Sequence, residues 1–264
     1  PRGRHRDRRT LHADQVGYLG SNLLVNLSAI LARLAPPVVT PIQFSWPQDY
    51  VAEDWFTDDA EGEPLTVGGR LLRQSSPRTC GAMVAVVSRM LMEEDFRARL
   101  RNVHDVEAGL YRDLRRDAVG PISWPACLGT PPWRLAHMLS AHAQRWPGVP
   151  AVSYRSIPVD TGTDSGKAIL QWVWHAVGVG LPVPLYTGGD IRGGLSHAVP
   201  RHVVLALPAT DDAPELSIYD PGTGHVYRVP IFSMAQRSTP LPAFGHWTHL
   251  AWAVLPQPIR SHHD

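Results

Sequence analysis

The feature that most constrains the fold is a change of pattern near Gly180. Before this residue, apolar side chains recur every three or four positions in several segments, which is the period of an amphipathic helix. After it, short apolar runs are separated by Gly, Pro and Asp, a pattern typical of strands joined by turns. Helices followed by strands with short connections favour an α+β fold with an antiparallel sheet.

The segments with the helical pattern lie before Gly180, and those with the strand pattern lie after it. Thr79 is expected to cap the second helix, and Leu31 and Leu34 belong to the apolar stripe of the first. The expected helices span residues 16–34, 79–100, 106–117, 131–145 and 165–178. The expected strands span residues 182–186, 202–207, 216–220, 225–229 and 247–255.

Composition excludes several classes of protein. With 44% hydrophobic and 19% charged residues, the chain of 264 residues lies far from the composition of disordered proteins. Its formal net charge of +1 predicts no nucleic-acid partner. The most apolar stretch, residues 82–92, contains Ser88 and Arg89, so no membrane span is predicted. Two cysteines allow at most one disulfide, which excludes a small domain held by several disulfides.

The sequence predicts four parts along the chain. Residues 1–15 form a basic arm or the end of a linker, and residues 16–69 form a helix with an irregular lead-in. Residues 70–258 form one folded domain, and residues 259–264 form a tail. Because the chain starts at Pro1 with a basic run, we expect it to be a piece of a longer protein, secreted or delivered as part of that protein.

Cys80 is the first candidate for chemistry. It opens the helix expected over residues 79–100, and a helix N-terminus favours the thiolate, which is the reactive form of a cysteine. Gln74 lies six residues earlier, where its amide and the Cys80 backbone N–H are placed to bind one oxyanion. Cys127, within the segment SWPACLG, is most simply a structural residue.

A cysteine nucleophile needs a base, and His202 and Asp220 are the candidates. His202 opens the expected strand 202–207 and Asp220 ends the next one, so a hairpin would bring the two side chains together. The imidazole would then take and return the proton, and the carboxylate would orient the ring. His197 is a rival for the same role, but it lies in the Gly-rich approach to the strand.

In this order, the residues resemble the papain-like cysteine peptidases, in which a Gln precedes a helix-opening Cys by six positions and His and then Asn or Asp follow far downstream. Here the His follows 122 residues after Cys80. The similarity is greatest to the bacterial branch of bacteriocin-processing and related peptidases, over about residues 70–255. The stretches that carry it are Gln74-Ser-Ser-Pro-Arg-Thr-Cys80-Gly-Ala, Gly180-Leu-Pro-Val, His202-Val-Val and Tyr219-Asp220-Pro221.

The resemblance implies a papain-like fold. In it, a helical lobe carries Cys80, an antiparallel β lobe carries His202 and Asp220, and a cleft lies between the lobes. It also implies thiol-dependent hydrolysis of a peptide or protein substrate without a metal or other cofactor. Two departures from papain itself fit the bacterial branch: Gly81 follows the Cys where papain has Trp, and Asp220 stands where papain has Asn.

Three functions remain open for this set of residues. Hydrolysis of a peptide bond is the leading one, as the activity of a bacterial effector or toxin domain with a cognate inhibitor or immunity protein as its partner. The same Cys, His and Asp also suit an acyl transferase, a transglutaminase-like enzyme or a deamidase, because only the group that meets the thioester differs. The third alternative is an inactive papain-like module that binds without catalysis.

Two other kinds of site are disfavoured. His246 and His249 lie three residues apart in a strand-like run, which places them on opposite faces and argues against zinc. The segment GTDSGKA at residues 162–168 lacks the glycine spacing and the Ser or Thr of a phosphate-binding loop. We therefore expect no metal and no nucleotide.

Overall fold

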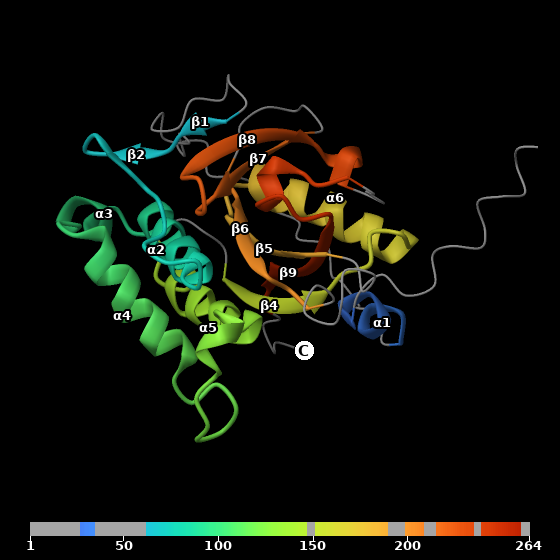
Figure 1. The fold of residues 1–264 in the computed structure, drawn as a ribbon, viewed down its shortest axis with the longest axis horizontal. Coiled ribbons are helices and arrows are strands. Elements are labelled where there is room, and N and C mark those ends of the chain that lie inside the picture. Colours follow the sequence, from blue (N-terminus) through green and yellow to red (C-terminus); the bar gives the residue numbers. More distant parts are fainter. Residues whose placement is uncertain are drawn as a thin grey trace, which may run out of the picture.

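The structure is a computed structural model, and it describes residues 27–34, 62–146, 151–189, 199–208, 215–234 and 239–259. These residues form a mixture of helices and one large antiparallel sheet, which confirms the α+β class (Figure 1). None of the helices in the described part of the chain is long and apolar enough to cross a membrane.

The helices gather mainly in the first two thirds of the chain, as the periodicity predicts. The α-helices are α1 (Leu27–Leu34), α2 (Cys80–Met92), α3 (Glu94–Arg99), α4 (Val103–Arg115), α5 (Pro132–Ala143) and α6 (Asp164–Gly178). Short 3-10 helices are η1 (Ala126–Leu128), η3 (Ile231–Met234) and η4 (Pro242–Phe244).

The main sheet has seven strands in the order β1-β8-β7-β6-β5-β9-β4, and all neighbours are antiparallel. A separate hairpin pairs β2 with β3. The short strands before α2 are β1 (Glu63–Pro64), β2 (Thr66–Val67) and β3 (Arg70–Leu71). The others are β4 (Val152–Pro158), β5 (Val183–Gly188), β6 (His202–Ala206), β7 (Glu215–Asp220), β8 (His225–Pro230) and β9 (His249–Pro258).

Helix α2 is enclosed by other elements of the protein. It packs against β6, α4 and α5, and eleven of its 13 residues are buried. Figure 1 shows α2, α4 and α5 grouped together, whereas α6 lies apart from them against β5, β7 and β9. A helix that is apolar on every side is stable only when other elements surround it, and this arrangement fixes both ends of α2.

The structure corrects the predicted helix 79–100. The helix ends at Met92, Glu93 adopts an extended conformation, and α3 then begins at Glu94. At this break the Glu93 carboxylate lies 3.0 Å from the Arg89 guanidinium, and the Arg89 guanidinium stacks on the ring of Phe96 at 3.9 Å. These contacts stabilise a change of direction that the apolar period does not reveal.

The apolar stripe predicted for the first helix is also wrong in the part that the structure describes. Leu31 and Leu34 of α1 are exposed, and the small residues Ser28, Ala29 and Ala32 face the protein instead. Helix α1 packs against β4 and β9, where small side chains let the backbones approach closely. Residues 16–26 of the expected helix lie outside the described residues.

Strand β4 lies in a part of the chain that the sequence analysis assigned to helices and loops. Val152 and Tyr154 alternate with polar residues, but the alternation shifts before Ile157, so the strand signal is short. The strand exists because it pairs with β9 along its whole length, from Val152 opposite Pro258 to Pro158 opposite Trp252. Tertiary pairing has overridden a weak local pattern.

We predict that Met83→Ala destabilises the protein strongly, because Met83 of α2 is fully buried. The free energy of unfolding should fall by about 2–5 kcal/mol, measured by urea denaturation. Leu34→Ala is the control, since Leu34 is 78% exposed and its loss should cost less than about 0.5 kcal/mol. Equal midpoints of urea denaturation for the two variants would contradict the burial of α2 between other elements.

Candidate active site

The N-terminus of α2 places Cys80 near the start of β6, the middle strand of the sheet. Cys80 is the first residue of the helix and is 4% exposed. Thr79 occupies the N-cap position as predicted, but its side chain makes no capping bond to the helix. Its hydroxyl donates instead to the Ser76 carbonyl at 2.8 Å, which tightens the turn that leads into the helix.

Gly81 is required by close packing beside the cysteine. A Cβ at this position would lie 2.6 Å from the Thr130 Cβ. Thr130 is buried, and its carbonyl accepts a hydrogen bond of 3.1 Å from the Tyr186 hydroxyl of β5. The segment before α5 thus presses on the first turn of α2, and a side chain larger than hydrogen at residue 81 would push the two apart.

The sheet brings His202 and Asp220 together as the sequence predicts. His202 is the first residue of β6 and Asp220 is the last residue of β7, and the two strands pair in antiparallel fashion. His202 Nε2 lies 2.5 Å from Asp220 Oδ1. Both side chains are largely buried, at 11% and 2% exposure, so this contact is shielded from water.

The turn after β7 holds the Asp220 carboxylate in place. The Gly222 backbone N–H donates to Oδ1 at 2.8 Å, and the Thr223 hydroxyl donates to Oδ2 at 3.1 Å. Burial by itself raises the pKa of Asp220, but the hydrogen bond and charge of His202, together with the Gly222 and Thr223 donors, outweigh burial and lower that pKa. Asp220 is therefore a carboxylate at neutral pH.

His202 also interacts with the Cys80 side chain, which contributes to the pKa of the ring. Because Nε2 faces Asp220, Nδ1 is the ring nitrogen that remains for the sulfur. Burial by itself lowers the pKa of His202, but the interactions of the ring with Asp220 and then with Cys80 outweigh burial and raise it to about 10. The ring thus holds its proton at neutral pH, between the Asp220 carboxylate and the Cys80 side chain.

The raised pKa links this ring to the stability of the fold. An unperturbed histidine has a pKa of 6.5, so the folded protein binds the His202 proton more tightly than the unfolded chain does. The resulting stabilisation is complete below about pH 6.5 and disappears as the pH rises through about 10.

Gly245 packs directly against the imidazole. A Cβ on this residue would lie 2.4 Å from His202 Cδ2 and 2.8 Å from Nε2. Gly245 also has a φ of +63°, a conformation that favours glycine. The turn after η4 therefore holds the ring at a contact distance that only a residue without a side chain allows.

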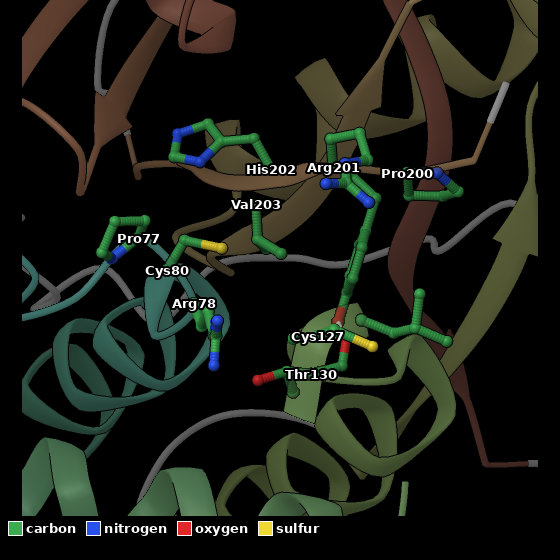
Figure 2. Close-up of a pocket in the computed structure, with 12 residues that line it drawn as sticks. Pro77, Arg78, Cys80, Cys127, Thr130, Pro200, Arg201, His202 and Val203 are labelled. Carbon is green, nitrogen blue, oxygen red and sulfur yellow. Dashed lines mark hydrogen bonds between the residues drawn. The ribbon is translucent and has the colours of Figure 1, made fainter. Parts of the chain in front are cut away.

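A cavity of about 270 Å³ opens at Cys80 and His202 (Figure 2). Figure 2 shows Cys80 and Arg78 on the helix side, His202 and Arg201 on the strand side, and Cys127 and Thr130 across from Cys80. Cys127 has a free, exposed thiol on this wall, unlike the structural residue that the sequence suggests.

Gln74 lies near the site but not on the wall of this cavity. Its Nε2 donates to the Ser76 carbonyl at 2.8 Å, and its backbone N–H donates to the Pro221 carbonyl at 2.9 Å. One amide hydrogen is thus used within the loop that leads to Cys80. The role of Gln74 as an oxyanion donor stays a prediction.

The segment before Cys80 is tied to the turn that holds Asp220. The Tyr219 hydroxyl donates to the Leu72 carbonyl at 2.7 Å, and the Arg73 Nε donates to the Gly222 carbonyl at 2.9 Å. On the helical side, the buried Glu107 of α4 accepts the Ser75 backbone N–H at 3.0 Å. These bonds set the distance between the helix that carries the thiol and the strands that carry the base and acid.

The structure brings together three of the four predicted residues, Cys80, His202 and Asp220, and places Gln74 beside them. The rival His197 lies outside the described residues. Sequence reasoning missed the residues that complete the surroundings of the site, because none has a local pattern that marks it. They are Arg78, Cys127, Thr130, Tyr186, Arg201 and Gly245.

No known family model matches the protein, and no curated protein sequence is significantly similar to it.

We predict that Asp220→Asn lowers the pKa of His202 from about 10 by about one unit or more, because it removes the charge and keeps the shape. NMR shifts of the His202 ring nitrogens against pH would measure this change. Asp113→Asn on the exposed face of α4 is the control and should leave the titration of His202 unchanged. If His202 of the wild type titrated near pH 6.5, the result would contradict a buried ion pair between His202 and Asp220.

We predict that Gly245→Ala displaces His202 and slows alkylation of Cys80 at pH 7 by about 100-fold, since a shift near 1 Å in a catalytic group has an effect of that order. Gly120→Ala is the matched control. Gly120 has a similar φ of +56° but nothing within 4 Å of the added Cβ, so it shares the backbone strain without the clash. Equal alkylation rates in the two variants would show that Gly245 does not position the ring.

Proposed function

We propose that the protein is a papain-like cysteine peptidase that hydrolyses peptide bonds with Cys80, His202 and Asp220. The observation that carries this proposal is the position of His202, which hydrogen-bonds the Asp220 carboxylate and lines one cavity with Cys80, a residue that also shifts the pKa of the ring. A buried imidazole whose pKa is raised to about 10 by a carboxylate and a thiol is an arrangement typical of catalytic sites.

The reaction follows from the proton on His202. The Cys80 thiolate attacks the carbonyl carbon of the substrate and forms a C–S bond. As the C–N bond breaks, the protonated His202 gives its proton to the leaving amine and becomes neutral. The neutral ring then takes a proton from water, whose oxygen attacks the thioester, and the second peptide leaves as a carboxylic acid with the thiolate and imidazolium restored.

The tetrahedral intermediate requires donors for its oxyanion. The first N–H groups of a helix have no partner within the helix, so the Cys80 backbone N–H at the start of α2 is available. Gln74 is the second donor in this proposal, and it would reach the oxyanion with the amide hydrogen that Ser76 does not accept. Asp220 keeps Nε2 of the ring occupied, so that Nδ1 stays turned toward the thiol.

The first test is the rate of alkylation of Cys80 by iodoacetamide between pH 5 and 9, located by peptide mass spectrometry. Cys80 should react rapidly at pH 6, where ordinary thiols are protonated and slow. Cys127 is the reference within the same protein, because it is an exposed thiol that is not one of the three proposed catalytic residues. His202→Ala should remove the advantage of Cys80 at pH 6, and equal rates for the two thiols in the wild type would overturn the proposal.

The second test is hydrolysis of unfolded, fluorescein-labelled casein by the wild type and by Cys80→Ala. The variant lacks the nucleophile and should release no fragments above background, and equal release would overturn the proposal. The products also separate hydrolysis from the related reactions. Hydrolysis yields two peptides with new amine and carboxylate ends, whereas side-chain deamidation leaves the peptide intact and acyl transfer joins it to an added amine.

A further inference from the structure

We propose that this site acts on peptide segments that carry a carboxylate beside the scissile bond, bound by Arg78 and Arg201. The inference rests on the proposed function and names its substrate class. The two arginines flank Cys80 and His202. Arg78 stands two residues before Cys80, and Arg201 directly precedes His202.

Both arginines line the cavity, from different elements. Figure 2 shows Arg78 beside Cys80 on the helix side and Arg201 beside His202 on the strand side. Their backbones are anchored, since the Arg201 N–H donates to the Thr187 carbonyl at 2.8 Å and the Arg78 N–H to the Ser76 hydroxyl at 3.4 Å. A peptide lying across Cys80 would therefore have a cation on either side of the bond that is broken.

Neither guanidinium stabilises the described part of the fold through a polar contact. Both side chains are exposed, and neither makes an ion pair or hydrogen bond with any residue that the structure describes. Other arginines of the described residues do have such partners, as Arg73 bonds the Gly222 carbonyl and Arg89 pairs with Glu93. The donors of Arg78 and Arg201 are free to bind a ligand.

The charged side chains on the wall of the cavity are all positive. Among the described residues of its wall there is no Asp or Glu, and the His202 ring is itself protonated at neutral pH. The Asp220 carboxylate lies behind the ring and is buried. The two arginines therefore give the entrance a positive potential, which concentrates anionic segments and disfavours basic ones.

A carboxylate is the anion that a peptide supplies. The planar guanidinium binds it through two parallel N–H donors, a geometry that a neutral amide does not match. The side chains of Asp and Glu carry this group, as does the C-terminus of a peptide, and both sources satisfy the site as described. The choice between an internal acidic residue and a terminal carboxylate is left to experiment.

The test is to digest a proteome-derived peptide library with the wild type and with Cys80→Ala, and to identify the new termini by mass spectrometry. Cleavages that depend on Cys80 should be enriched for Asp or Glu within about two residues of the scissile bond, or for bonds within about two residues of a C-terminus. Cys80-dependent cleavage without either enrichment would overturn this inference and leave the proposed function standing. No Cys80-dependent cleavage would overturn the proposed function.

The arginines are then tested on one cleaved peptide and two neutral versions of it, with Glu or Asp replaced by its amide and with an amidated C-terminus. Arg78→Gln and Arg201→Gln should each lower kcat/KM for the charged peptide about fivefold, and the double variant more than about tenfold. The neutral version that lacks the recognised carboxylate should change less than about twofold, which identifies the source of the group. Equal losses on all three peptides would overturn the inference.

A matched control and a second readout keep the inference separate from peptidase activity. Arg155→Gln changes an exposed arginine of β4 that does not line the cavity, so it should leave the preference unchanged. The ratio of Cys80 alkylation rates with anionic iodoacetate and neutral iodoacetamide should fall about tenfold in the double variant, and less at high salt. An unchanged ratio would show that the two arginines do not attract anions to the thiol.

Discussion

The burial of helix α2 is the constraint on which the rest of the site depends. Because the helix is enclosed by β6, α4 and α5, its first residue cannot move relative to the ends of the strands. The contact of Gly81 with Thr130 closes the same end from the other side. Cys80 thus meets His202 as a consequence of core packing, and the energy that holds the thiol in place comes from apolar side chains far along the helix.

The ion pair of His202 and Asp220, where β6 begins and β7 ends, is held in place by contacts with uncharged groups. A buried imidazolium and carboxylate lose much hydration energy, which their attraction and the donors of the turn after β7 offset. Gly245 limits the movement of the ring, and the bonds from Tyr219 and Arg73 keep the two parts of the site together. The exposed Arg78 and Arg201 line the cavity, and their guanidinium groups make no ion pair with a described residue.

Several elements show why some features could be predicted and others could not. The start of α2 at Cys80, the start of β6 at His202 and the end of β7 at Asp220 agree with the local patterns, since helix and strand periods extend over neighbouring residues. The break at Glu93, the inward face of α1 and strand β4 were mispredicted. Each depends on a partner elsewhere in the protein, such as β9 for β4, that a local period does not identify.

The sequence by itself determined the order and type of most elements and which reactive side chains stand at their ends. Those properties follow from periodicity, turn residues and the chemistry of single residues, all of which are local. Only the tertiary structure decided that Gly245 touches the ring of His202, that Cys127 shares a cavity with Cys80, and that Arg78 and Arg201 face it from two sides. Such contacts join residues far apart in the sequence, and the packing of helices against the sheet sets their distances.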